Sequence, residues 1–269
     1  MTDNASSSSL RGRLVRASAA MAITSIAFTA AASAQAPARP PAAEAPAVAP
    51  RPLVKPATPS VVKTSKAGAG VYELAASPST GIVYVAAVGK RGEEGGAKIL
   101  GLDETTLEVK KTIDVSAAPA FGVGINDKTQ KLYTTNTRNG NVSAIDLKTG
   151  QTVATIALEG SPKAHVFRAL VDESRNVVYI SETAGRVWVI DGATDKLVGT
   201  VEGVGKMTVG LALDSARNQL FAANLGSQDV AVIDLATKTV TSRIPVEGGR
   251  PTQMAYDAKT RRLFVSNQQ

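Results

Sequence analysis

Short apolar runs separated by polar turn residues dominate the chain from residue 61 onward. Within a run, apolar and polar side chains alternate, as in residues 229–233 (DVAVI), with the period of a half-buried strand. Clusters of Gly, Asn, Asp, Ser and Thr bound the runs, and no apolar period of 3.6 residues persists. The pattern therefore predicts an all-β fold of short antiparallel strands.

These strands recur as a repeat of roughly 44 residues. One anchor is an aromatic residue between apolar neighbours, spaced by 49, 46, 42 and 43 residues, at Tyr84, Tyr133, Tyr179, Phe221 and Phe264. A second anchor is an aliphatic residue followed by aspartate, spaced by 43, 45 and 43 residues, at Asp103, Asp146, Asp191 and Asp234. Four strands per repeat predict the blades of a β-propeller, with the aromatic residues packed between neighbouring blades.

The number of blades follows from the repeats. Four repeats contain all four predicted strands, and the fifth ends at Gln269 after its second strand. Residues 61–64 (VVKT) are a candidate outer strand, and Asn139-Gly140 predicts a hairpin turn because both residues tolerate positive φ. We expect a propeller domain over residues 61–269 with about four and a half to five blades.

Two segments of different composition precede the repeats. Arg11, Arg13 and Arg16 are followed by an uncharged apolar run and the small-residue motif ASA, so residues 1–34 are expected to be a cleaved export signal. A membrane anchor is the alternative, but the run of roughly 16 residues is short for a span. Residues 35–60 hold eight prolines and are expected to form a disordered Pro/Ala-rich linker. The expected location is periplasmic or secreted, without stable membrane insertion after cleavage.

Composition limits the chemistry. The net charge of +7 favours an anionic ligand, but residues 61–269 hold 24 Lys and Arg against 21 Asp and Glu, which leaves +3. The chain has no cysteine and one histidine, which excludes disulfides, thiolate chemistry and multi-histidine metal sites. No cofactor, no metal site and no catalytic residue is predicted.

Several segments resemble the YVTN-repeat proteins, and most closely the YncE-like periplasmic β-propellers. The matching stretches are residues 68–74 (GAGVYEL), 103–109 (DETTLEV), 132–150 (LYTTNTRNGNVSAIDLKTG), 205–207 (GKM) and 210–215 (GLALDS). The resemblance implies a seven-bladed ring, export, no established catalytic residues and single-stranded DNA as a candidate ligand. Because fewer than five blades are present, we expect a truncated ring, and an unusual small ring is the alternative.

Repeated polar residues have a structural interpretation. Each Asp-x-x-Thr motif lies between the third and fourth strands of a different repeat, where the aspartate is expected to cap backbone amides rather than bind calcium. Asn136, Asn224 and Asn267 share one position after the second strand and are expected to bind local groups.

Isolated candidates are weaker. His165 has no oriented nucleophile nearby in the sequence, so an ordinary loop histidine is expected rather than a general base. Residues 89–96 (GKRGEEGG) lack the GxxxxGK[ST] order of a phosphate loop and are expected to be a long flexible loop. Trp188 is expected in the core or at the propeller axis.

The loop face of the propeller is the expected binding surface. It contains the loops between second and third strands and the loops between blades, and nine basic residues are expected there against seven acidic ones. The candidate ligand-binding residues are its basic side chains Arg138, Lys163, Arg168, Arg186, Lys206 and Arg250. A solvated face of mixed charge is the alternative, because single-stranded DNA sites also use stacking aromatics and most aromatics here are repeat anchors.

We therefore expect a non-enzymatic, exported binding module that presents the loop face to a partner. Single-stranded DNA is the most concrete candidate, and another anionic ligand or a protein is the alternative partner. A propeller enzyme of lactonase-like or quinone-dependent type is the first alternative function, and it predicts converging acids or arginines at the axis. A scaffold fragment without independent function is the second. We expect a monomer if the ring is complete.

Overall fold

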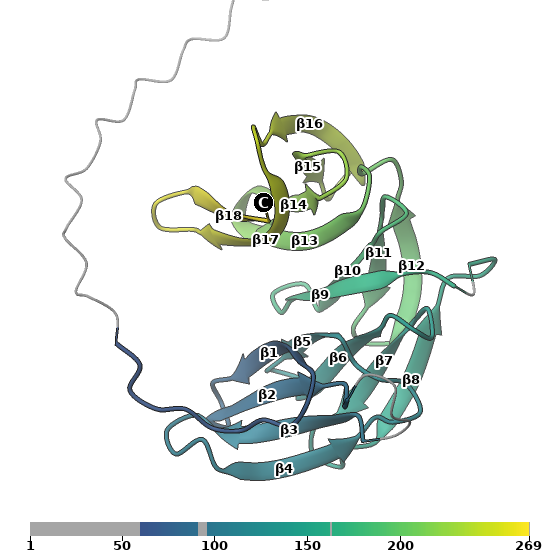
Figure 1. Ribbon diagram of the computed structural model, residues 1–269. Helices are drawn as coiled ribbons and strands as arrows, with labels where there is room; N and C mark the ends of the chain where they lie inside the picture. The colour runs from purple at the N-terminus through teal and green to yellow at the C-terminus, as the bar shows by residue number, and fades with distance from the viewer. Residues whose placement is uncertain (1–59, 91–95, 162, 269) are drawn as a thin grey trace, which may run out of the picture. The chain divides into compact units, whose positions relative to one another are not determined.

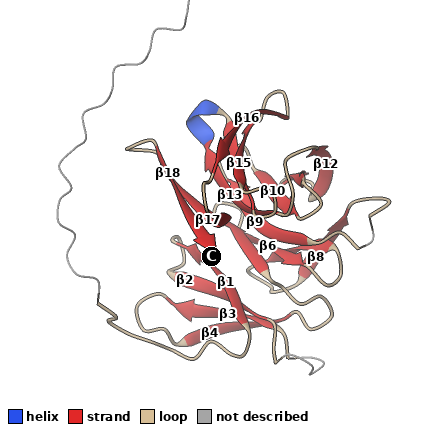
Figure 2. Ribbon diagram, turned by 45° about the horizontal axis from the view of Figure 1, so that its top comes forward, coloured by secondary structure: helices blue, strands red, loops and turns tan. Residues whose placement is uncertain are grey.

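The computed structural model describes residues 60–90, 96–161 and 163–268. The expected export signal and all of the expected linker except Ser60 lie outside these residues. The described part consists of strands and turns, with a single short 3-10 helix, η1 (Ser215–Arg217) (Figure 2). It contains no helix long and apolar enough to cross a membrane.

Four blades each contain four antiparallel strands in chain order. Blade 1 contains β1 (Val71–Ser77), β2 (Ile82–Ala87), β3 (Lys98–Asp103) and β4 (Val109–Asp114). Blade 2 contains β5 (Gly122–Asn126), β6 (Lys131–Asn136), β7 (Asn141–Asp146) and β8 (Thr152–Ala157). Blade 3 contains β9 (Val166–Asp172), β10 (Val177–Glu182), β11 (Arg186–Asp191) and β12 (Lys196–Val201). Blade 4 contains β13 (Thr208–Asp214), β14 (Gln219–Asn224), β15 (Asp229–Asp234) and β16 (Thr239–Pro245).

Blade 5 contains two strands, β17 (Arg250–Asp257) and β18 (Arg262–Gln268). Consecutive inner strands, from β1 through β5, β9 and β13 to β17, contact one another, and the fourth strands β4, β8, β12 and β16 lie at the periphery (Figure 1). The predicted β-propeller with an incomplete fifth blade is confirmed.

The expected outer strand at residues 61–64 is wrong. These residues form no strand, and Val61 and Val62 are exposed. Ala67, in the same segment, packs against the apolar cluster of Val85, Leu100 and Leu102 in blade 1. That contact holds the segment against the side of the first blade.

The repeat aromatics pack between blades, as predicted. Tyr84, Tyr133, Tyr179 and Phe221 each belong to a buried cluster that includes residues of the following blade. The Tyr133 ring is fully buried, and its hydroxyl donates a hydrogen bond to Asp195 Oδ1 across the interface (2.7 Å). Burial and this hydrogen bond raise the pKa of the Tyr133 hydroxyl. Trp188 is fully buried in the same cluster, so it is a core residue.

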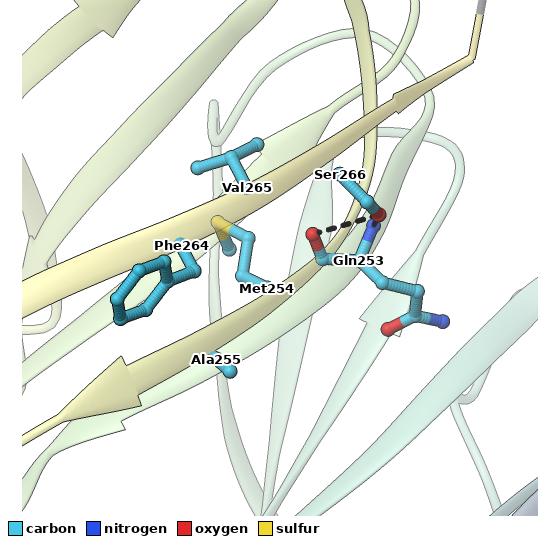
Figure 3. A pocket seen from close by; sticks show the side chains of 6 residues that line it. All are labelled: Gln253, Met254, Ala255, Phe264, Val265 and Ser266. Carbon is cyan, nitrogen blue, oxygen red and sulfur yellow. Dashed lines mark hydrogen bonds between the residues drawn. The ribbon is translucent and has the colours of Figure 1, made fainter. Parts of the chain in front are cut away.

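Phe264 occupies the repeat position in blade 5 and is 57% exposed. It lines a hollow of about 390 Å³ over β17 and β18, together with Met254 and Val265 (Figure 3). Gln253 and Ser266 join the two strands at the end of this hollow, where Ser266 Oγ donates to the Gln253 carbonyl (3.2 Å). The aromatic residues at the other four repeat positions are buried against the following blade, whereas Phe264 is not. The difference in exposure reflects the apolar surface that such a contact covers.

Polar contacts join neighbouring blades at the end of the sheets opposite the loop face. Asp127 of blade 2 accepts hydrogen bonds from Ser79 N (3.0 Å) and from the hydroxyl groups of Ser77 and Ser79 in blade 1. Similar contacts join the later blades: Asn126 to Asn176, Arg175 to Ser215, and Tyr256 to Asp214. These contacts fix the angle between blades and therefore the relative positions of their loops.

The Asp-x-x-Thr motifs form the predicted turns. Asp146 Oδ1 accepts the amide hydrogens of Lys148 (2.9 Å) and Thr149 (2.8 Å). The same two amide contacts recur at Asp103, Asp191 and Asp234. The backbone hydrogen bond from the threonine is the main cause of a lowered pKa for each of these carboxyl groups. The aspartates therefore shape the turns, as predicted.

Each outer strand carries one extra residue. The pairing register shifts at the same place in all four complete blades, so two outer-strand residues lie opposite one partner. The unpaired residues are Lys110, Val153, Val198 and Thr241. Such bulges increase the local twist of an edge strand.

We predict that Tyr133→Ala destabilises the protein by about 3–5 kcal/mol, because it leaves a large cavity between blades 2 and 3. Phe264→Ala is the matched control: it removes an aromatic ring from the same repeat position, and its cost should stay below about 1 kcal/mol because that ring is half exposed. Urea unfolding of both variants measures the difference. Equal losses would contradict the inter-blade role of the aromatic.

We predict that the free energy of unfolding falls as the pH drops through about 4 and below. The turn aspartates have lowered pKa values in the fold, so they stabilise it above the ordinary aspartate pKa of about 3.9 and lose this effect on protonation. Urea midpoints measured between pH 6 and 3 test this. Asp146→Asn, whose amide oxygen accepts the same hydrogen bonds without titrating, should show a shallower loss; a stability that rises below pH 4 would refute the linkage.

Candidate functional site

A cleft on the loop face lies between the first three blades. Its volume is about 710 Å³. It is lined by residues that follow β2 and β6, that precede β1, β5 and β9, or that begin β1: Ala69, Gly70, Tyr72, Val88, Gly89, Lys90, Phe121, Thr137, Arg138 and His165. We call this the loop-face cleft. Its described lining contains basic and aromatic side chains and no carboxylate.

Two aromatic rings and a guanidinium form the centre of the cleft. The rings of Tyr72 and Phe121 meet edge to face, with centroids 4.7 Å apart and an interplanar angle of 73°. The Arg138 guanidinium carbon lies 5.5 Å from the Phe121 ring centroid, within the range of a cation–π contact. Tyr72 is 61% exposed, so its ring is available to a ligand. The group combines a positive charge with aromatic surface.

The backbone fixes both sides of the cleft. Residues 69–70 and 88–89 are joined by hydrogen bonds from Val88 N to Gly70 O and from Gly89 N to Ala69 O, both 3.0 Å. Gly70 has a φ of 66°, and a Cβ atom there would lie 2.5 Å from Gly89 O. The close approach therefore requires glycine at position 70.

Arg138 is placed by the predicted hairpin turn between β6 and β7. The turn spans residues 137–140, and its amides at Asn139 and Gly140 both donate to Asn136 O. Of the predicted pair, Gly140 has the positive φ (68°) and Asn139 does not. The side chain of Asn139 donates to Ala117 O (3.2 Å), which ties the turn to the loop that carries Phe121.

Arg168 is engaged in an ion pair. Its guanidinium contacts the Glu73 carboxylate, which joins the inner strands of blades 1 and 3. Glu73 Oε2 also accepts the Val123 amide hydrogen (3.1 Å), and burial lowers the pKa of Arg168. Both residues line an axial cavity of about 390 Å³. The acid and the arginine expected at the axis of an enzyme thus occur there, but they bind each other.

Arg186 is also paired. Its Nη2 atom lies 2.6 Å from Glu182 Oε1, and this contact raises the pKa of Arg186. The other Glu182 oxygen accepts the indole N–H of Trp188 (2.8 Å). Glu182 occupies the repeat position that Asn136 and Asn224 hold in blades 2 and 4, where the asparagines bond to local groups as expected. Blade 3 therefore uses a buried carboxylate at this position.

The other predicted basic residues lie on the same face but outside the cleft. All three are exposed: Lys163 and Lys206 precede β9 and β13, and Arg250 is the first residue of β17. The structure therefore brings only Arg138 of the six candidates into the loop-face cleft, and distributes three others along the face. Within the described residues, no group of three His, Asp or Glu side chains could hold a metal ion.

The two aromatic residues of the cleft were not predicted from the sequence. Tyr72 and Phe121 lie outside the repeat anchors, one at the beginning of β1 and the other just before β5. Their position in or next to inter-blade loops is the feature that could have placed them on the expected binding surface. His165, expected to be an ordinary loop histidine, is exposed and lines the cleft. Gly89 and Lys90, from the glycine-rich loop, line it as well, while residues 91–95 lie outside the described part of the chain.

Comparison with known proteins supports the fold and the family. No known protein-family profile matches the chain. The chain is 31% identical over 211 residues to the uncharacterized protein YncE of Salmonella typhi and to that of Escherichia coli strain K12. The matched region covers 74% of this chain and 60% of YncE. The chain therefore spans less than two thirds of the length of these relatives.

Solved structures of low sequence identity share the architecture. The β-propeller domain of Cps50 (Swd1) from Myceliophteria thermophila matches with a TM-score of 0.62 at 14% identity, covering 78% of this chain and 65% of that one. Hydrazine synthase from Kuenenia stuttgartiensis matches with a TM-score of 0.56 at 15% identity, covering 75% and 55%. These likenesses show the fold alone, whereas the sequence identity shows the closer relationship. The chain is therefore a YncE-like β-propeller.

Proposed function

We propose that this protein is an exported, non-enzymatic binding module, located in the periplasm or secreted, that binds single-stranded DNA on its loop face. The loop-face cleft supplies the stacking and charge contacts at one point, and Lys163, Lys206 and Arg250 extend the basic surface beyond it. The observation that carries the proposal is the contact between the exposed Tyr72 and the half-buried Phe121, beside Arg138.

The chemistry of the cleft suits a base with its phosphate. A nucleobase offers a planar π surface that stacks on an aromatic ring, and stacking contributes about 1–3 kcal/mol per base. An arginine contacts phosphate oxygens through two parallel hydrogen bonds. Single strands expose both groups, whereas duplex DNA hides its base faces. The combination of Tyr72, Phe121 and Arg138 therefore favours a single strand.

Ion pairing reduces the number of candidate basic side chains on the loop face that attract a phosphate strongly. Arg168 forms an ion pair with Glu73, and Arg186 forms one with Glu182. Each arginine therefore attracts a phosphate less than an unpaired cation does. The same pairing supports a binding role over catalysis, because the Glu73 carboxylate accepts an ion pair and an amide hydrogen and is engaged in both rather than free to remove a proton.

We predict that Arg138→Gln weakens binding of an oligo-dT strand about tenfold at low salt, through loss of a charge-assisted hydrogen bond to phosphate. The slope of log affinity against log salt should fall by about 0.7, the value for one phosphate contact on a single strand. Fluorescence anisotropy at several salt concentrations measures both quantities. Lys148→Gln, on the opposite face, is the matched control, and equal effects of the two variants would contradict this site.

We predict that Tyr72→Ala lowers the affinity for oligo-dT by about 1–3 kcal/mol, while Tyr72→Phe retains most of it, because the ring face makes the contact. Phe264→Ala removes another exposed aromatic far along the chain and should leave the affinity unchanged. The same anisotropy assay applies. If the unmodified protein does not bind oligo-dT at low salt, single-stranded DNA is not its ligand.

A further inference from the structure

We propose that His165 is a ligand-contacting residue of the loop-face cleft, and that protonation of its imidazole strengthens the binding of phosphate-bearing ligands as the pH falls. The choice of ligand rests on the proposed function. The role of His165 rests on its place in the cleft, on the groups around it and on its being the single histidine of the chain.

The backbone presents His165 to the cleft from a fixed position. Its carbonyl accepts the Thr183 amide hydrogen (3.1 Å). The carbonyl of the next residue, Val166, accepts the hydroxyl hydrogen of Thr137 (2.7 Å), and Thr137 itself lines the cleft. Ala164 and Val166 are buried on either side, while His165 is exposed. The main chain is thus anchored and the imidazole is left available to a ligand.

The groups that share the cleft with His165 favour an anion. Among the described lining residues, the charged or titratable ones are Lys90, Arg138 and Tyr72. The turn packed beside His165 contributes Thr183, which is uncharged, and the nearby Glu182 carboxylate is directed to Arg186 and Trp188. A proton on the imidazole therefore adds a positive charge to a site that already holds cations, and an anion between them offsets their repulsion.

The pH range of this effect is defined by the side chains present. Imidazole is the side chain that ordinarily changes charge between pH 5 and 8. Carboxylates ordinarily titrate near pH 4, and phenol, ammonium and guanidinium groups near pH 10 or above. Phosphodiesters stay charged throughout this range, and the α-amino group of the chain titrates near its upper end. A change in affinity that His165→Gln abolishes therefore reports the histidine.

Thermodynamic linkage fixes the direction in which pH changes the affinity. A ligand that prefers the protonated imidazole raises the pH at which the imidazole loses its proton, and protonation in turn raises the affinity for the ligand. The gain is fully present at low pH and disappears as the pH rises through the midpoint of the bound state. A shift of that midpoint by about one pH unit corresponds to about a tenfold change in affinity.

The test uses the full chain and an oligo-dT strand without a terminal phosphate. Affinities are measured by fluorescence anisotropy at constant ionic strength between pH 5.5 and 8, for the unmodified protein, His165→Gln and Lys148→Gln. In a second arm, NMR follows the imidazole resonances of the unmodified protein against pH, with sodium sulfate or with sodium chloride at equal ionic strength. Sulfate is a fully charged tetrahedral anion over this range.

We expect about tenfold tighter DNA binding at pH 5.5 than at pH 8 for the unmodified protein and for Lys148→Gln, and a flat profile for His165→Gln. We also expect sulfate to move the imidazole midpoint to higher pH. Equal pH profiles for His165→Gln and the unmodified protein would overturn the role of His165 while leaving DNA binding intact. Absence of DNA binding with a sulfate-dependent midpoint would overturn the proposed ligand but support the anion site, and an unmoved midpoint without DNA binding would overturn both.

Discussion

Packing of one aromatic ring per blade against the next blade is the constraint on which the rest of this structure depends. A four-stranded blade has two apolar faces and cannot bury either by itself, so its stability comes from its neighbours. Tyr84, Tyr133, Tyr179 and Phe221 fill the four interfaces, and polar contacts such as Ser79 to Asp127 set the angle between blades. Blade-to-blade geometry is therefore fixed by buried surface, and the loops are left free to differ.

The loop-face cleft is a product of this arrangement. Tyr72 and Lys90 come from blade 1, and His165 lies just before blade 3. In blade 2, Phe121 precedes β5 and Arg138 follows β6. No single repeat contributes all of these groups. Their approach depends on the rotation from one blade to the next, which the buried aromatics hold constant. A rigid scaffold of this kind lowers the entropy cost of ordering a binding site.

Much of the fold could be predicted because it is repeated. Spacing placed the second-strand aromatics and the Asp-x-x-Thr turns, and each lies where the repeat requires. The candidate site was harder, because its side chains pair across blades. Arg168 in blade 3 contacts Glu73, which lies in blade 1. Nothing in the local sequence of either residue indicates that contact. The same holds for Tyr72 and Phe121, which are separate in the chain and adjacent in space. Periodicity reveals shared positions, while contacts between unlike positions depend on three-dimensional geometry.

The extra residue in each outer strand has a consequence for how partners can be recognised. An outer strand with a regular edge offers a row of free amide and carbonyl groups, on which an extended peptide can add as a further strand. The bulges at Lys110, Val153, Val198 and Thr241 interrupt that row at the same level in every complete blade. Backbone-mediated strand addition is thereby discouraged around the rim. Recognition of a partner through side chains, such as those of the loop-face cleft, is not restricted in this way.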